Sequence, residues 1–154
     1  MTGLSNPESG RRPALLTSAV FYIIAAFYAY GAVVHVLNIA SPTGFNWSEA
    51  PLKWQVLDVA YLALDVVVVV GLLKRSRVGI AAFFMAAFSQ ICLYTVLRSW
   101  VLDVPPAFQR SPAEVAYLDS LVMFHIVTCL VVGLTLVLRQ KRPYLPKASS
   151  SNSG

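Results

Sequence analysis

Four long apolar runs constrain the fold of this chain more than any other feature. They cover residues 13–40, 52–73, 78–101 and 113–138, and short polar stretches separate them. Each run can cross the hydrocarbon core of a bilayer as an α-helix, which needs about 20 residues. A membrane-spanning β-barrel would instead show alternating segments of about ten residues. We therefore expect an all-α polytopic membrane protein, built as a four-transmembrane-helix bundle.

The composition agrees with this class. Hydrophobic residues make up 57% of the 154 residues and charged residues 12%, against about 25% charged residues in a typical soluble domain. The net charge of +5 suggests nucleic acid at first sight, but the basic residues form short clusters beside the apolar runs. That pattern is typical of cytoplasmic loops, so we expect the lipid bilayer and not nucleic acid as the partner. The polar ends, residues 1–12 and 143–154, are predicted to be disordered tails.

The fourth run has the clearest start signal. Tandem prolines at Pro105 and Pro106 end the third run, because proline cannot continue a helix. Ser111 then precedes Pro112 and lies three residues before Glu114. This spacing predicts a capping box, with the serine as N-cap and the glutamate bonding back to it.

The basic residues predict the orientation of the bundle. Only Lys53, Arg98 and Arg110 fall at or towards one side. The other nine fall on the opposite side: Arg11, Arg12, Lys74, Arg75, Arg77, Arg139, Lys141, Arg142 and Lys147. The positive-inside rule then puts both termini in the cytoplasm. In that orientation all three tryptophans lie near the outer interface, as an aromatic belt.

The second run carries two carboxylates, Asp58 and Asp65, in an otherwise apolar helix. Seven residues are two helical turns, so these acids share a face and lie roughly 10 Å apart. Trp54 and Tyr61 fall on the same face. An acid inside the membrane normally faces a protein interior or a water-filled cavity. Asp65 lies near the midplane and needs a partner, for which His125 and His35 are the basic side chains within reach.

Polar residues from all four runs collect at the same depth, between the midplane and the outer surface. Gln90, Tyr94 and Arg98 recur every four residues and are expected to stack on one face. We predict a polar pocket that opens outward, because four-helix bundles build sites from side chains on facing helices. Its candidate ligand-binding or proton-relay residues are Asp65, Asp58, His125, His35, Arg98, Tyr94, Gln90 and Asp119.

Several of these residues also have a purely structural interpretation. Arg98 can pair with Asp58 or with Asp119, or extend to the outer headgroups. His125 can be a neutral histidine that bonds a neighbouring helix, and Gln90 and Tyr94 can make interhelical hydrogen bonds. Asp58 can have the purely structural role of capping nearby donors or of pairing with Arg98.

The general layout resembles the DoxX-like group of small bacterial membrane proteins. The features that carry the resemblance are four spans in about 150 residues, short basic ends, an acid-bearing second helix, and Gly31 four residues before His35 near the end of the first run. That group includes small subunits associated with quinone-linked sulfur oxidation. The resemblance implies an accessory or redox-linked subunit of the bacterial inner membrane, and it assigns no catalytic residue.

Our first functional hypothesis is a small redox-linked or accessory membrane subunit that binds a quinone-like or another amphipathic ligand. Histidine, carboxylate, tyrosine and arginine side chains can hold carbonyl oxygens and relay protons. The cofactor stays unknown, because the sequence has no Fe–S, haem or flavin motif, and electrons would come from a partner subunit. The alternatives are a proton-linked transporter or channel component that acts as a homo-oligomer, and a structural assembly module without a ligand. A metal site made of His35, His125, Asp58 and Asp65 is the weakest interpretation, because these residues lack any short local spacing.

Overall fold

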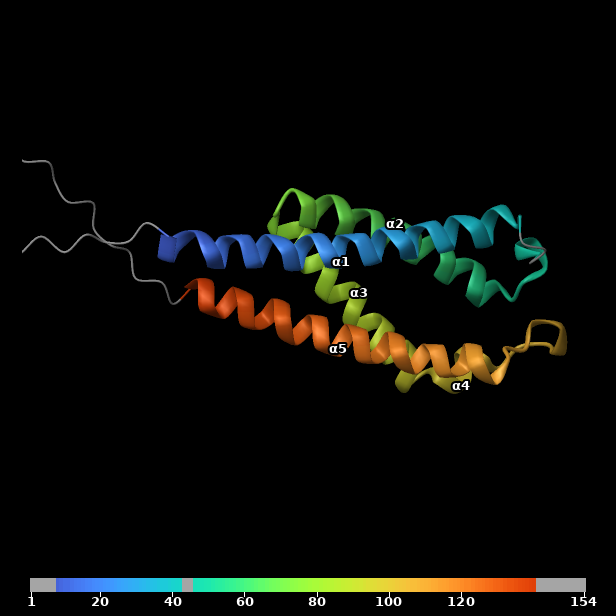
Figure 1. Cartoon of the computed structure of the whole chain (residues 1–154). Helices are drawn as coiled ribbons and strands as arrows, with labels where there is room; N and C mark the ends of the chain where they lie inside the picture. Colours follow the sequence, from blue (N-terminus) through green and yellow to red (C-terminus); the bar gives the residue numbers. More distant parts are fainter. Residues whose placement is uncertain (1–7, 43–45, 141–154) are drawn as a thin grey trace, which may run out of the picture.

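The computed structural model describes residues 8–42 and 46–140, and this part of the chain is helical and contains no strand (Figure 1). Four helices are long and three are short. The long helices are α1 (Glu8–Ala40), α2 (Leu52–Leu73), α3 (Arg77–Thr95) and α5 (Pro112–Gln140). The short ones are the 3₁₀-helices η1 (Trp47–Glu49) and η2 (Pro106–Phe108), and α4 (Arg98–Leu102).

The four long helices each contain a segment that is long and apolar enough to cross a membrane. These segments are Thr17–Ala40, Leu52–Leu73, Arg77–Thr95 and Pro112–Leu138. Large apolar side chains such as Ile23, Val78 and Leu130 are exposed on the outside of the bundle, where a bilayer would cover them. The chain therefore has the build of a multi-pass membrane protein, as predicted.

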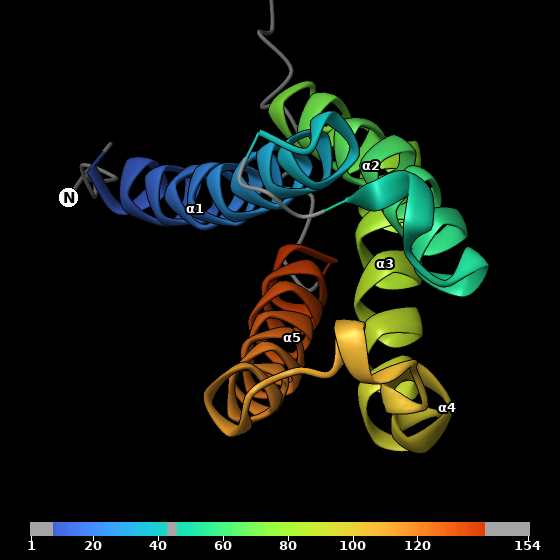
Figure 2. The same cartoon turned by 90° about the vertical axis from the view of Figure 1, so that its right-hand side faces the viewer.

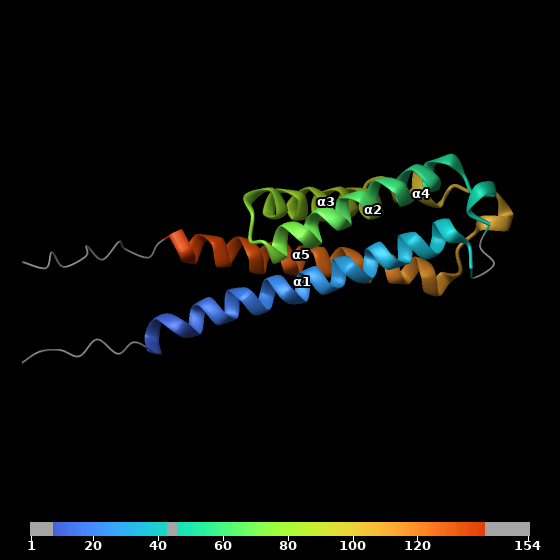
Figure 3. The same cartoon turned by 90° about the horizontal axis from the view of Figure 1, so that it is seen from above.

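The long helices form a bundle with two different ends. α2 packs against α1 on one side and against α3 on the other, and α3 packs against α5. Figure 2 shows α3 between α2 and α5. The start of α1, the end of α5 and the α2–α3 turn lie towards one end, which we call the turn end (Figure 3). The connection from α1 to α2, together with α4 and η2, lies at the other end, which we call the loop end.

The α2–α3 turn is closed by a Schellman motif. Arg75 adopts a left-handed conformation with φ 51°, and its N–H bonds Leu72 O while the Ser76 N–H bonds Gly71 O. The Ser76 hydroxyl then accepts from Gly79 N at 3.0 Å and caps α3. A Cβ atom on Gly71 would collide with the backbone of Gly79, so the two helices cross at glycine.

The main hydrophobic core lies towards the turn end. It is made of side chains from the middle of α1, the first half of α3 and the second halves of α2 and α5. Its buried members are Phe21, Ile24, Ala25, Tyr28, Val68, Leu72, Ala82, Phe83, Ala86 and Val132. The small alanines of α3 allow the neighbouring helices to approach closely, which is how helices associate inside a membrane.

Most helix boundaries follow the sequence prediction. α2 has the predicted limits, and α5 exceeds its predicted range by one residue at its start and two at its end. α1 begins at Glu8, five residues before the start of the first apolar run at residue 13. Residues 1–7 of the predicted N-terminal tail and the predicted tail at 143–154 lie outside the described residues. The capping box is confirmed, because Glu114 N donates to Ser111 Oγ and Ser111 N donates to Glu114 Oε2.

The third run is not one helix, contrary to the prediction. α3 ends at Thr95, and the next residues turn before α4 begins at Arg98. The Leu97 N–H bonds Cys92 O, five residues back, which is one residue too many for an α-helix. The break falls at Val96 and Leu97, inside the long apolar run, so hydrophobicity alone gave no sign of it. The break turns Arg98 off the line of Gln90 and Tyr94.

Candidate functional site

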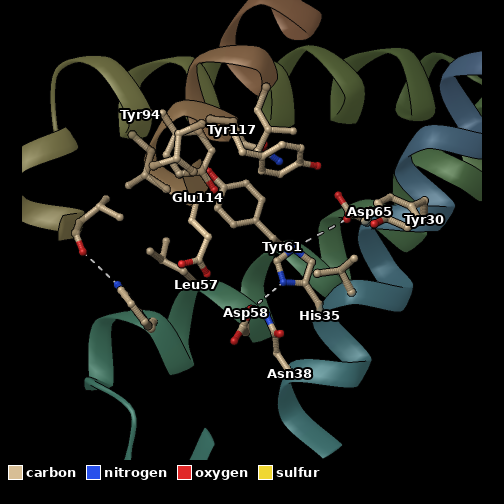
Figure 4. Close-up of a pocket in the computed structure, with 18 of the residues that line it drawn as sticks. Tyr30, His35, Asn38, Leu57, Asp58, Tyr61, Asp65, Tyr94, Glu114 and Tyr117 are labelled. Atoms are coloured by element: carbon tan, nitrogen blue, oxygen red, sulfur yellow. Dashed lines mark hydrogen bonds and ion pairs between the residues drawn. The ribbon is translucent and has the colours of Figure 1, made fainter. Parts of the chain in front are cut away.

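A cavity of about 330 Å³ lies between the helices towards the loop end (Figure 4). α1, α2, α3 and α5 contribute most of its lining, and α4 closes part of it. Aromatic rings form much of the wall: Phe27, Tyr28, Tyr30, Trp54, Tyr61, Tyr94 and Tyr117. The polar groups that point into this aromatic space come mainly from α1 and α2. Among the described residues, a cavity lined by aromatic and polar side chains is therefore present towards the loop end.

His35 and Asp58 form the central polar pair of the cavity. His35 Nδ1 lies 2.7 Å from Asp58 Oδ1, and Asn38 Nδ2 donates to the same oxygen at 3.2 Å. The His35 ring also stacks on Tyr61, with their centroids 6.2 Å apart and the planes inclined by 14°. Because the carboxylate can only accept, the imidazole donates through Nδ1 and directs Nε2 deeper into the bundle.

Asp65 lies below this pair and is 2% exposed. Its Oδ2 is 4.0 Å from His35 Nε2, so one imidazole ring stands between two carboxylates. Its Oδ1 is buried and has no hydrogen-bond partner among the described residues. A Cβ atom on Gly31 would lie 2.7 Å from Asp65 Oδ2, so the absence of a side chain on α1 makes room for this carboxylate.

Five of the eight predicted site residues line the cavity. The acids Asp58 and Asp65 face it from α2, His35 from α1, and Gln90 and Tyr94 from α3. The other three, Arg98, Asp119 and His125, are not part of its lining. These three residues lie outside the lining for different physical reasons.

Arg98 pairs with Asp119 and with no other acid among the described residues. Its guanidinium donates to both carboxylate oxygens and to Val115 O. The hydrogen bond to Asp119 raises the pKa of Arg98, and the Asp119 side chain is 61% exposed. The interpretation of Asp58 as the partner of Arg98 was therefore wrong. The break after α3 carries Arg98 away from α2 and towards the exposed side of α5.

His125 is fully buried behind the cavity and does not reach Asp65. Its Nδ1 lies 2.6 Å from Leu121 O, one turn back on its own helix, and its Nε2 has no partner in the described part of the chain. Its ring packs edge-on against Phe27 and Tyr28. Of the two histidines predicted as partners for Asp65, only His35 approaches it.

The four residues considered for a metal site, His35, His125, Asp58 and Asp65, do not converge on one point. In the described ranges, no three histidine, cysteine, aspartate or glutamate side chains gather closely enough to hold a metal ion. His35, Asp58 and Asp65 are held along a line, with the imidazole between the carboxylates, and His125 lies apart from them.

Contacts between polar side chains and backbone carbonyls hold the loop end of the cavity in place. Trp54 Nε1 donates to Val101 O at 3.0 Å, and Lys53 Nζ donates to Trp100 O and Asp103 O. The guanidinium of Arg110 lies 4.7 Å from the centre of the Trp54 ring. These contacts fasten α4 and the segment after it onto the start of α2.

Sequence reasoning missed part of the lining. Arg110 and Glu114 line the cavity, and the Arg110 guanidinium lies 2.8 Å from Glu114 Oε1. The sequence had indicated only a helix cap for the glutamate. Tyr28, Tyr30 and Tyr117 were also missed. The signal available for the tyrosines was their number near the outer ends of the first and fourth runs, where a phenol can combine an apolar ring with a hydrogen-bonding tip.

No family model, curated protein or solved structure matches this chain.

Proposed function

We propose that this protein binds a quinone-like or another amphipathic ligand in the cavity, as a small redox-linked or accessory membrane subunit. The observation that carries this proposal is Asp65: a carboxylate 2% exposed, with one oxygen unpartnered, facing an aromatic cavity inside a transmembrane bundle. Such a residue is costly in the membrane and marks a functional site by default.

The cavity suits the head group of such a ligand. Its volume of about 330 Å³ is at the lower end of the range of ligand sites, about 300–1,000 Å³. Aromatic rings can stack on a flat ring, while a few polar groups fix its orientation. An apolar tail would lie between helices or in the bilayer.

The polar groups also suit proton transfer. Asp65, His35 and Asp58 lead from the deep part of the cavity towards the loop end, with Nε2 of the imidazole on the Asp65 side and Nδ1 on the Asp58 side. A histidine bridging two acids can pass a proton from one to the other. The electrons of a redox reaction would come from or go to a partner subunit.

The proposed orientation puts both termini in the cytoplasm and the cavity in the outer half of a bacterial inner membrane. The basic residues Lys74, Arg75 and Arg77 lie at the turn end, away from the cavity, which supports this orientation through the positive-inside rule. The resemblance to the DoxX-like group supports the choice of membrane and of a quinone-linked role.

The proposal is tested by identifying the compounds that co-purify with the protein. The full chain is purified in lipid nanodiscs, and organic extracts are compared by mass spectrometry between wild type, Val34→Trp and Val33→Trp. Val34 lines the cavity, whereas its neighbour Val33 is exposed on the outside of α1. We expect an amphipathic compound in wild type and in Val33→Trp that is depleted in Val34→Trp. Identical extracts from all three proteins would contradict a ligand site.

A second measurement separates the proposal from its alternatives. Asp65→Asn should abolish ligand-linked activity of the host complex while folding and assembly persist. Full activity of that variant would favour a structural role for the polar residues. Proton flux through the purified oligomer in liposomes would favour the transporter alternative.

A further inference from the structure

Two side chains at the deep end of the cavity have a buried polar atom without a hydrogen-bond partner. They are Tyr28, through its hydroxyl, and Asp65, through Oδ1. Both residues line the cavity and both are 2% exposed. Buried polar groups are nearly always paired, so each exception needs an explanation. A bound group that enters the cavity would supply the missing partner for both.

Tyr28 and Asp65 line the same cavity from two neighbouring helices, α1 and α2. Gly31 lies against Asp65, with only 2.7 Å between a Cβ built on it and Asp65 Oδ2. Tyr28 comes one helical turn before Gly31 and therefore falls on the same side of α1. The tyrosine and the aspartate thus form the floor of the cavity, from α1 and α2 respectively.

The two carboxylate oxygens of Asp65 have different surroundings. Oδ2 faces His35 Nε2 at 4.0 Å, whereas Oδ1 has no partner among the described residues. The 4.0 Å separation is longer than a hydrogen bond, so Oδ2 lies near the imidazole without being bonded to it, and the buried Oδ1 is the oxygen left for a ligand. An ionised carboxylate only accepts hydrogen bonds, while a phenol both donates and accepts.

We infer that this floor binds a hydroxyl group, so that the cavity prefers the reduced, hydroxyl-bearing form of a quinone-like ligand over the oxidised form; the inference rests on the proposed function. A hydroxyl can donate to Asp65 Oδ1 and accept from the Tyr28 hydroxyl at the same time. When Asp65 is ionised, a quinone carbonyl would bring one acceptor against another there, because a carbonyl only accepts. An ammonium only donates, so it would leave the proton of the Tyr28 hydroxyl unpaired.

The test compares three probes on the full chain in nanodiscs, under anaerobic conditions. They are a decyl-substituted hydroquinone, the corresponding quinone, and the dimethyl ether of the hydroquinone, which keeps the ring and tail but has no hydroxyl. Equilibrium dialysis gives the three dissociation constants. We expect the hydroquinone to bind about tenfold more tightly than either other probe, the effect of one hydrogen bond to a charged acceptor.

Two variants and their matched controls assign the preference to the floor. Asp65→Asn should bring the hydroquinone and quinone affinities together, whereas Asp119→Asn, on the exposed side of α5, should leave the tenfold ratio intact. Tyr28→Phe should weaken hydroquinone binding about tenfold, whereas Tyr22→Phe should not, because Tyr22 is exposed and lies outside the cavity. Thermal unfolding confirms that each variant is folded.

The outcomes distinguish this inference from the proposed function. Equal binding of hydroquinone and quinone, or tighter binding of the quinone, would overturn the hydroxyl preference and leave a quinone-like site standing. A preference that survives in Asp65→Asn would overturn the assignment to the floor. Binding of none of the three probes would overturn the quinone-like site and the inference together.

Discussion

The two ends of the bundle are built from the same four helices and pack in opposite ways. Towards the turn end, small residues bring the helices together, with glycine against glycine at the α2–α3 crossing and a continuous apolar core. Towards the loop end, aromatic and polar side chains surround a cavity of about 330 Å³. The two ends cannot be distinguished by hydrophobicity, because both lie within apolar spans.

The difference shows what controls packing inside a membrane. Lipid tails are as apolar as the side chains, so association depends on close contact and on hydrogen bonds between helices. Where Gly71 meets Gly79, close contact holds α2 and α3 together. Where His35 meets Asp58, a hydrogen bond of 2.7 Å joins α1 to α2 and leaves space beside it. One end is therefore held by shape and the other by polar pairs.

The largest effect should come from the crossing at the turn end. In Gly71→Val, the new side chain would meet the Gly79 backbone, which cannot rotate away, so we expect a loss of about 3 kcal/mol in the free energy of unfolding. Unfolding titrations in detergent measure it. Gly133→Ala is the matched control, since a Cβ there meets nothing within 4 Å. Equal stability of Gly71→Val and wild type would show that close contact does not hold this end.

An intermediate effect is expected from the polar pair at the loop end. A double-mutant cycle of His35→Ala and Asp58→Ala should give a coupling energy of about 1–2 kcal/mol, because both partners are largely withdrawn from water. The same cycle on Arg98 and Asp119 should give much less, because that pair is exposed. If the coupling energy of His35 and Asp58 is no larger than that of Arg98 and Asp119, polar pairs do not hold the loop end together.

The smallest effect on stability should come from the glycine beside the cavity. In Gly31→Ala, the added methyl group would displace only the end of the Asp65 side chain, and alanine favours the helix by about 1 kcal/mol over glycine. We therefore expect a nearly unchanged free energy of unfolding but weaker binding of the hydroquinone probe. Both quantities are measured on the same preparation. A large loss of stability would mean that the loop end is packed as tightly as the turn end.

The sequence predicted the class of the fold, and five of its eight candidate site residues line one cavity. The four spans, the limits of α2 and the cap at Ser111 follow from local patterns, which depend on near neighbours in the chain. The grouping of Asp58, Asp65 and His35 followed from depth, because residues of equal depth on neighbouring helices face the same layer. Depth does not fix the rotation of a helix about its axis, and for that reason His125 and Asp119 were wrongly placed in the pocket.

The break between α3 and α4 shows a second limit. It lies among apolar residues that would suit a continuous helix, and only its tertiary contacts distinguish it. Arg98 reaches α5, and the Val101 carbonyl accepts from Trp54 on α2. Such contacts join residues far apart in the sequence, so no local pattern records them.

Tyr28 belongs to both ends of the molecule. The residue is a buried member of the apolar core and also lines the cavity, and its hydroxyl has no hydrogen-bond partner among the described residues. A substitution that improves one environment therefore alters the other, and this position cannot be optimised for stability and for recognition independently. The same sharing gives a practical signal, since a molecule seated on this hydroxyl would stiffen the core beneath it and raise the melting temperature of the whole bundle.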